Sequence, residues 1–223
     1  PYPQPFNYAA INNLAVDKAR GEVVCLLNND LQLITPHWLE EMLALLLRDG
    51  VGAVGAKLLW PNNLVQHGGV VTGVHQLAAH VGNDWLAEEP GYMYRNCVSC
   101  RWSAVTAACL LTRRDEYLEC GGLDAVNFPV TFNDVDYCLK LAQQGKGVVW
   151  TPQARFYHYE SASRGKDDTA VKQAQSRREM QRLRGKWGET LLNDPFYNPN
   201  FSLSTWVGVF DGLALPPGKR SVR

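Results

Sequence analysis

VVCLLNND, residues 23–30, joins an unbroken apolar run to two amides and a carboxylate. Strand-forming residues without a polar interruption are typical of a strand buried on both faces, because successive side chains of a strand point to opposite faces of the sheet. Asn28, Asn29 and Asp30 then lie where this strand ends and the chain leaves the sheet. We therefore expect Asp30 to place a fixed negative charge at the edge of a sheet, for a ligand that needs one.

Apolar strands and amphipathic helices alternate along the rest of the chain, which predicts an α/β fold with a mostly parallel sheet flanked by helices. Further strands are expected over residues 50–60, 103–114 and 147–152. Helices are expected over residues 6–20, 36–46, 115–120, 133–144 and from 166 through 187. Thr35 and Asn133 are the predicted N-caps of two of these helices. Ligands of such folds bind beyond the carboxyl ends of the strands, at the edge where Asp30 is expected.

Composition argues against two classes of partner. Lys plus Arg and Asp plus Glu both number 22, so the chain has no net basic field, and no nucleic-acid partner is expected. No apolar run approaches the roughly 18 residues of a spanning helix, and no cleavable signal opens the chain. We expect a soluble cytoplasmic protein in which any anionic ligand is held by a local site.

The six cysteines lack the spacing of a secreted disulfide framework. Cys97 and Cys100 in CVSC could begin a zinc knuckle, but a structural zinc needs four ligands and no second pair follows nearby. Cys25, Cys109 and Cys138 lie in apolar patterns, where cysteine usually packs as a small buried residue. Zinc is therefore the less favoured interpretation.

A second acidic cluster lies in FNDVDYCLKL, residues 132–141. Asp134 and Asp136 fall in the first turn of the predicted helix, where the positive helix end keeps a carboxylate ionised and able to accept a proton or bind a cation. For an isolated pair of aspartates, simple capping of the helix is the more common alternative.

A histidine follows the last predicted strand. His158 opens the polar segment HYESASRG, residues 158–165. A carboxylate at Asp30 and an imidazole at His158, each at the end of a strand, suit Mn²⁺ or Mg²⁺, which keep open positions for phosphate oxygens. Taken alone, His158 is more typical of a hydrogen-bonded structural residue.

The order and spacing of several segments are more specific than any one of them. The segments are PFNYAAINN (5–13), LLNNDLQLITPHWLEEML (26–43), GAVGAKLLWPNNLVQHGGVV (52–71), SAVTAACLLTRR (103–114), FNDVDYCLKL (132–141), HYESASRG (158–165) and DPFYNPNFS (194–202). Together they resemble an inverting family 2 glycosyltransferase of the GT-A fold, particularly the bacterial enzymes of cell-surface polysaccharide assembly such as O-antigen synthesis. The resemblance covers nearly the whole chain.

This resemblance implies a donor site. Asp30 would bind a metal, Mn²⁺ or Mg²⁺, that bridges the diphosphate of a UDP- or dTDP-sugar, and His158 would complete the metal site. Asn28 replaces the first aspartate of the family's Asp-X-Asp motif, and Asn28 and Asn29 are grouped with Asp30 as donor contacts. Arg164 in SRG would reach the diphosphate.

The resemblance also implies a base and an acceptor site. Asp134 matches the second residue of the family's Glu-Asp motif and would be the general base. Asp124, Asp136, His67 and Trp102 are the candidate acceptor contacts. For three of them an alternative stays open: Asp124 could cap a turn, His67 could stabilise a turn, and Trp102 could pack in the core rather than stack on a sugar.

The implied reaction is a single sugar transfer with inversion at the anomeric carbon. QRLRGKW, residues 181–187, does not reproduce the motif of processive family members, because its tryptophan is wrongly spaced. The acceptor would be a glycan or a lipid-linked glycan, so that peripheral contact with the inner face of the plasma membrane is expected. The alternative is a noncatalytic scaffold or binding module that keeps the fold. A nucleotidyltransferase would need a Gly-rich loop with a basic residue near the N-terminus, and none is visible.

We expect a catalytic core over residues 1–165 and a helical and irregular extension over residues 166–223 packed on it. In the family, a strand-helix-strand portion that holds the nucleobase precedes PFNYAAINN, which here begins at Pro5. Either the chain is a fragment or its nucleotide pocket is incomplete, and weak or absent activity of the chain alone is expected.

Overall fold

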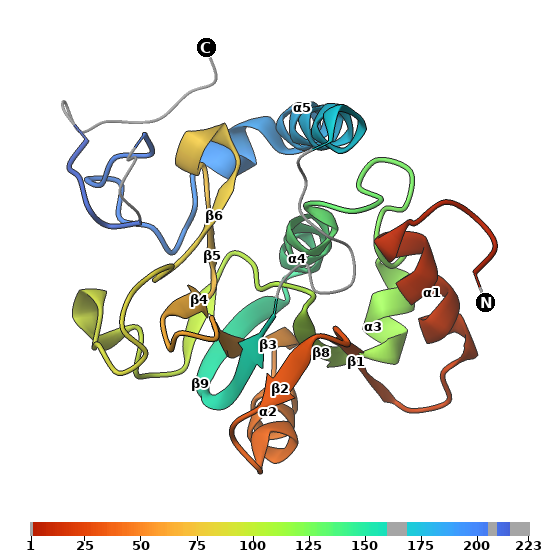
Figure 1. The fold of residues 1–223 in the computed structure, drawn as a ribbon, viewed down its shortest axis with the longest axis horizontal. Coiled ribbons are helices and arrows are strands. Elements are labelled where there is room, and N and C mark those ends of the chain that lie inside the picture. Colours follow the sequence, from red (N-terminus) through yellow and green to blue (C-terminus); the bar gives the residue numbers. More distant parts are fainter. Residues whose placement is uncertain (1, 160–168, 205–208, 215–223) are drawn as a thin grey trace.

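A mixed sheet forms the centre of the computed structural model, which describes residues 2–159, 169–204 and 209–214 (Figure 1). Within these residues the main sheet has seven strands, with β1, β8, β3, β9 and β2 in spatial order, β4 paired to β3, and β7 paired to β9. Their bounds are β1 Val23–Leu27, β2 Leu31–Leu33, β3 Val51–Leu59, β4 Val65–His67, β7 Cys100–Trp102, β8 Cys109–Arg113 and β9 Gly147–His158. A separate hairpin pairs β5 Val70–Thr72 with β6 Ala78–His80.

The expectation of a mostly parallel sheet is wrong. Among the described strands only β3 and β9 pair in parallel, and β8 is antiparallel to both of its neighbours, β1 and β3. The long segment between β3 and β8 contains no long helix that carries the chain back across the sheet, and β8 begins on the side where β1 and β3 end. Because β8 opposes both β1 and β3, the strands β1, β3 and β9 still share one direction, and their carboxyl ends lie at one edge.

Five α-helices lie in the described part of the chain. They are α1 Tyr8–Lys18, α2 Trp38–Leu46, α3 Arg114–Glu119, α4 Asn133–Gln143 and α5 Ala170–Leu192, and short 3₁₀ turns occupy Val74–Gln76 and Tyr92–Tyr94. None of these helices combines the length and the apolar character that crossing a bilayer requires.

The predicted helix starts are corrected at two places. Thr35 does not cap α2, because its N–H points to the carbonyl of Arg155 in β9 and the helix begins only at Trp38. Asn133 is the first residue of α4 rather than its cap, and Phe132 takes the cap position in a left-handed conformation with φ 59°. The true side-chain cap of α1 is Asn7, whose carbonyl oxygen accepts the N–H of Ala10 at 2.9 Å.

Two apolar layers enclose the sheet. On one face, Met42 and Leu46 of α2 are fully buried against β3, β8 and β9. On the other face, α4 packs through Tyr137 and Leu141, with α5 beyond it (Figure 1). Trp187 of α5 belongs to the second layer. Burial of such side chains, at about 25 cal/mol per Å² of apolar surface, is the main force that fixes the sheet between its helices.

Lys57 is a charged residue inside this core. It lies on β3, is fully buried, and donates hydrogen bonds from Nζ to the carbonyls of Ala87 at 2.6 Å and Asn96 at 3.2 Å. These bonds tie β3 to the loop between β6 and β7. Burial, and then the neighbouring Arg155, lower the pKa of Lys57 to about 8. The folded protein therefore holds this proton less tightly than the unfolded chain does.

Replacing Lys57 should change how stability depends on pH. Between pH 8 and the ordinary lysine value of 10.5 the unfolded state binds a proton that the folded state has released, so the wild-type free energy of unfolding rises with pH in this window. The free energy of unfolding of the wild type, minus that of Lys57→Met, should therefore increase by about 3 kcal/mol between pH 8 and pH 10.5. Urea unfolding of both proteins at pH 7.5, 9 and 10.5 measures the difference, and a constant difference across the three values would contradict the assignment.

Candidate functional site

Sheet pairing brings Asp30 and His158 together. β2 runs antiparallel to the end of β9, with Leu31 opposite His158, and the carbonyl of Asp30 accepts the N–H of Tyr159 at 3.0 Å. As a result Oδ1 of Asp30 lies 3.2 Å from Nε2 of His158. The amide of Asn28 lies 3.4 Å from the same ring nitrogen. The end of VVCLLNND and the end of β9 therefore form one site.

Gln66 determines which nitrogen of His158 carries a proton. The amide oxygen of Gln66, on β4, lies 2.7 Å from Nδ1 of His158. Because an amide oxygen only accepts, Nδ1 must donate, and in the neutral ring Nε2 then presents a lone pair toward Asp30. Oδ1 of Asp30 is buried and has no hydrogen-bond donor among the described residues. A contact between two hydrogen-bond acceptors, here Oδ1 of Asp30 and Nε2 of His158, is favourable only when a proton or a cation lies between them.

This pair of atoms suits a divalent cation. A carboxylate oxygen and an imidazole nitrogen are both ligands of Mn²⁺, and an outer hydrogen bond such as that of Gln66 is the usual way to orient a histidine ligand. Within residues 2–159, 169–204 and 209–214 no group of three or more His, Cys, Asp or Glu side chains is placed to hold a metal. The two protein ligands would thus leave most coordination positions to a bound ligand.

Asp134 is held at the start of α4. Its Oδ2 accepts the N–H of Ala107 at 3.2 Å, and its Oδ1 accepts the N–H of Val135 at 2.8 Å. Tyr8 lies beside it and donates from its hydroxyl to the carbonyl of Ala107 at 2.8 Å. Burial, and then the charge of Asp134, raise the pKa of Tyr8 well above its ordinary value. The carboxylate is half-buried and so keeps access to solvent.

One three-residue segment connects these side chains. In Thr106–Ala108, the carbonyl of Ala108 accepts the N–H of Asn28 at 2.9 Å, while the N–H of Ala107 binds Asp134. The structure therefore connects Asp134 and the start of the turn that carries Asp30 through a single short segment.

His67 also binds this segment. Its Nε2 accepts the N–H of Thr106 at 3.3 Å, and its ring lies 4.8 Å from that of His80 in an edge contact. Burial, followed by the nearby His80 and His158, holds the pKa of His67 well below its usual range, so the ring is neutral. Full burial excludes contact with an acceptor in this conformation. Of the two interpretations open for His67, the geometry matches stabilisation of a turn.

Two further acceptor candidates lie in the interior. Trp102 is 1% exposed and packs between the guanidinium of Arg95, 4.7 Å from the ring, and Phe210. Asp136 is fully buried and accepts from Lys186 at 2.6 Å and from the indole of Trp187 at 2.9 Å. Neither side chain can touch a soluble sugar in this conformation, because other protein groups occupy all of their surroundings.

Asp124 remains partly accessible but is not unpartnered. It accepts the backbone and side-chain N–H groups of Asn127, both at 2.9 Å, and lies 3.3 Å from Nζ of Lys186. Partial burial alone would raise the pKa of Asp124, but the Asn127 hydrogen bonds and the Lys186 charge lower it. Asn29 is exposed at the turn between β1 and β2. Arg164 lies outside the described residues.

Sequence reasoning missed Gln66, Tyr8 and the role of Thr106–Ala108. Gln66 directly precedes His67 in VQHGG, and only the histidine was selected as a candidate site residue. Strand alternation carries the missing signal: residues 66 and 67 of β4 point to opposite faces, so at most one of them can face His158. Thr106–Ala108 was expected inside a strand over 103–114, but β8 begins only at Cys109, which leaves its backbone groups available.

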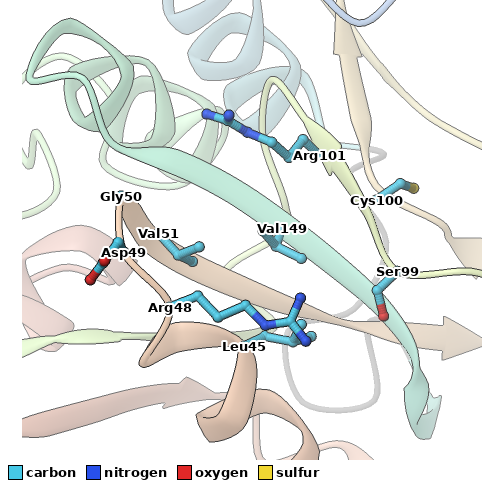
Figure 2. Close-up of a pocket in the computed structure, with 9 residues that line it drawn as sticks. All are labelled: Leu45, Arg48, Asp49, Gly50, Val51, Ser99, Cys100, Arg101 and Val149. Carbon is cyan, nitrogen blue, oxygen red and sulfur yellow. The ribbon is translucent and has the colours of Figure 1, made fainter.

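A cavity of about 290 Å³ lies apart from this site (Figure 2). Val51 and Val149 line it, and the side chain of Arg48 runs along it from the end of α2. Because β3 and β9 run in parallel from here toward His158, the cavity lies at the opposite end of these strands. No predicted site residue lines it.

The sequence of the chain is similar to a known protein family and to individual proteins. Residues 8–184 match the family described as "Glycosyltransferase like family 2". The chain is 47% identical over 200 residues to "Uncharacterized protein y4gI" of Sinorhizobium fredii (strain NBRC 101917 / NGR234). It is 41% identical over 208 residues to "O-antigen biosynthesis protein RfbC" of Myxococcus xanthus. Each alignment covers 90% of this chain but only 22% and 15% of the respective relatives, so the chain spans a minor part of their length.

Among solved structures, the chain is similar to one entitled "Crystal structure of GalNAc-T7 with UDP, GalNAc and Mn2+". The TM-score is 0.54 with 14% sequence identity, and the likeness covers 70% of this chain and 31% of that chain. At this identity the likeness concerns the fold alone, and it makes the α/β fold with its mixed sheet GT-A-like.

The two aspartates of α4 should differ in their effect on stability. Asp136→Ala leaves the buried indole of Trp187 without its acceptor and removes the shorter of the two ion pairs of Lys186, and should lower the free energy of unfolding by about 3 kcal/mol. Asp134→Ala removes a partly solvated carboxylate that accepts two backbone N–H groups, and should cost about 1 kcal/mol. Urea unfolding at pH 7 measures both, with the exposed Asp49→Ala as control. Equal losses for the two α4 variants would contradict the distinction.

Proposed function

The chain belongs to the glycosyltransferase-like family 2, and from this membership we propose that it moves a sugar from a nucleoside-diphosphate donor to a hydroxyl group of a glycan or lipid-linked acceptor. The proposal includes inversion at the anomeric carbon and assistance by Mn²⁺ or Mg²⁺. The observation that carries it is that the single segment Thr106–Ala108 binds both the side chain of Asp134 and the backbone of Asn28, two residues before Asp30, which contacts His158.

Asp134 is the proposed general base. A sugar hydroxyl is a poor nucleophile, so attack on the anomeric carbon requires a group that takes its proton as the new bond forms. Each oxygen of Asp134 accepts one backbone N–H and keeps a second lone pair for that proton. General-base catalysis of this kind contributes about 10²–10⁴-fold to the rate.

The donor is proposed to bind through its diphosphate beside Asp30 and His158. These residues would hold the cation, and the Gln66 hydrogen bond keeps Nε2 of His158 available as a ligand. When bound, the cation supplies electrostatic stabilisation of the negative charge on the departing diphosphate. Asn28 and Asn29 are further proposed donor contacts, as is Arg164. A UDP-sugar is the first donor to test, because the GT-A-like neighbour is named with UDP and Mn²⁺, and a dTDP-sugar is the second.

The acceptor is proposed to be a growing surface polysaccharide. Support comes from the relative named for O-antigen biosynthesis, which shares 41% identity with this chain. A lipid-linked acceptor would bring the protein to the inner face of the plasma membrane. We propose that residues 1–165 carry the catalytic groups and that residues 166–223 support them.

Donor binding should depend on Asp30. Asp30→Asn keeps the size of the side chain but removes the charge that attracts the cation, so Mn²⁺-dependent binding of UDP should weaken at least tenfold. Calorimetric titration with UDP and with dTDP, with and without Mn²⁺, measures this, and Asp49→Asn is a matched control at the opposite end of the sheet. Absence of metal-dependent binding in the full-length wild type would favour the scaffold alternative.

Turnover should depend on Asp134 without a matching loss of donor affinity. Asp134→Asn keeps the size of the side chain and one of the two backbone hydrogen bonds, because its amide has a single acceptor oxygen. It cannot accept the proton of the sugar hydroxyl, and should lower kcat by about 10²–10⁴-fold. Sugar release from a panel of nucleotide sugars gives the rate, and NMR of the product gives its anomeric configuration. Wild-type activity in Asp134→Asn, or a product that retains the donor configuration, would contradict the proposed mechanism.

A further inference from the structure

Helix α5 holds the segment that leads into Asp134. Four of its side chains contact residues 124–136: Glu179, Arg182, Lys186 and Trp187. Arg182 donates to the carbonyls of Val126 at 2.8 Å and Asn127 at 3.3 Å. These contacts recur about every helical turn along one side of α5, so the helix binds residues 124–136 at several points.

Glu179 contacts the residues that directly precede α4. Its side chain is 1% exposed, and its Oε2 accepts the N–H of Thr131 at 2.6 Å, the hydroxyl of Thr131 at 2.8 Å and the N–H of Val130 at 3.3 Å. Its other oxygen accepts from Gln175 at 2.9 Å. A buried carboxylate that binds several backbone donors fixes their positions strongly, because any movement leaves a charge without partners.

The residue between these donors and α4 is strained. Phe132 has φ 59° and ψ 5°, a left-handed conformation that a bulky side chain adopts only at a cost. Such a residue persists when its surroundings determine it. Glu179 fixes the two residues before Phe132, and the N–H of Asp136 binds the carbonyl of Phe132 at 2.9 Å after it. The turn at Phe132 sets the direction in which α4 starts, and therefore where Asp134 points.

A second contact holds α4 from its buried side. Lys186 lies between Asp124, 3.3 Å from its Nζ, and Asp136, 2.6 Å away, while Trp187 donates to Asp136. Asp136 is two residues beyond Asp134, so fixing it also fixes the rotation of α4 about its axis. Held at Thr131 and at Asp136, the first turn of α4 has little freedom.

We propose that Glu179 is a positioning residue for the general base: by holding the left-handed turn at Phe132 it aims Asp134 at the acceptor hydroxyl. The inference rests on the proposed function, since it assumes that Asp134 is the base. It assigns to α5 a part in catalysis although no residue of α5 touches the reacting atoms.

The test uses Glu179→Ala and Glu179→Gln in the full-length protein, with Glu189→Ala, the other glutamate of α5, as control. Glu179→Ala should lower kcat at least tenfold while KM for the donor and Mn²⁺-dependent UDP affinity stay unchanged. Glu179→Gln retains one acceptor oxygen and should lose less. Glu189→Ala should resemble wild type in each measurement.

A double variant separates positioning from a general loss of stability. Glycine adopts positive φ without the cost that phenylalanine bears, so Phe132→Gly should restore part of the activity lost in Glu179→Ala, although the change also removes packing. A merely structural role predicts additive losses instead. Wild-type kcat in Glu179→Ala, or losses that add in the double variant, would overturn the proposal.

Failure of the proposed function has a different signature. If wild type itself shows no turnover with any donor, the enzyme assignment fails, and the carboxyl ¹³C titration of Asp134 then decides the positioning. That titration should shift in Glu179→Ala and stay unchanged in Glu189→Ala. An unchanged titration in both variants would overturn the positioning independently of activity.

Discussion

The backbone of Thr106–Ala108 is the constraint on which the candidate site depends. Its three residues bind His67, Asp134 and Asn28 through successive main-chain groups. The segment enters β8, which pairs with β1 on one side and β3 on the other, so its position follows from the centre of the sheet. The side chains of His67 and Asp134 and the backbone of Asn28, which are far apart in the sequence, therefore converge, because each satisfies one main-chain group of this short segment, as buried polar groups require.

The order of strands and helices predicted from local sequence agrees with the structure, although the two predicted helix caps do not. β1 covers Val23–Leu27, so the polar tip follows the strand as expected from the change of composition at Asn28. The placement of Asp30 and His158 at one edge was also accessible, although their contact further requires β2, a strand that was not predicted, to pair with the end of β9. The antiparallel insertion of β8 was not, since its direction depends on the long segment after β3, whose residues carry weak periodicity.

The burial of Asp136 shows how much of the candidate site could be predicted from the sequence. Residues two apart on a helix differ by about 200° in direction, so Asp134 and Asp136 cannot both face one crevice. This rule alone selects one aspartate of the pair, but it does not say which. Lys186 and Trp187, about fifty residues later in the chain, contact Asp136 and bury its carboxylate, which leaves Asp134 as the accessible one. The burial of Trp102 and His67 likewise depends on packing partners that local sequence does not reveal.

Asn28 gives the proposed metal site a distinctive charge. With Nδ1 of His158 donating to Gln66, the imidazole is a neutral ligand, and Asn28 contributes no charge where the family motif has an aspartate. Asp30 is then the one formal negative charge that the pair offers to a divalent cation. Hard cations are held mainly by the number and charge of their oxygen ligands, so under the proposed function the diphosphate supplies much of the affinity. Metal and donor would then bind together, because neither finds a complete set of partners in the protein alone.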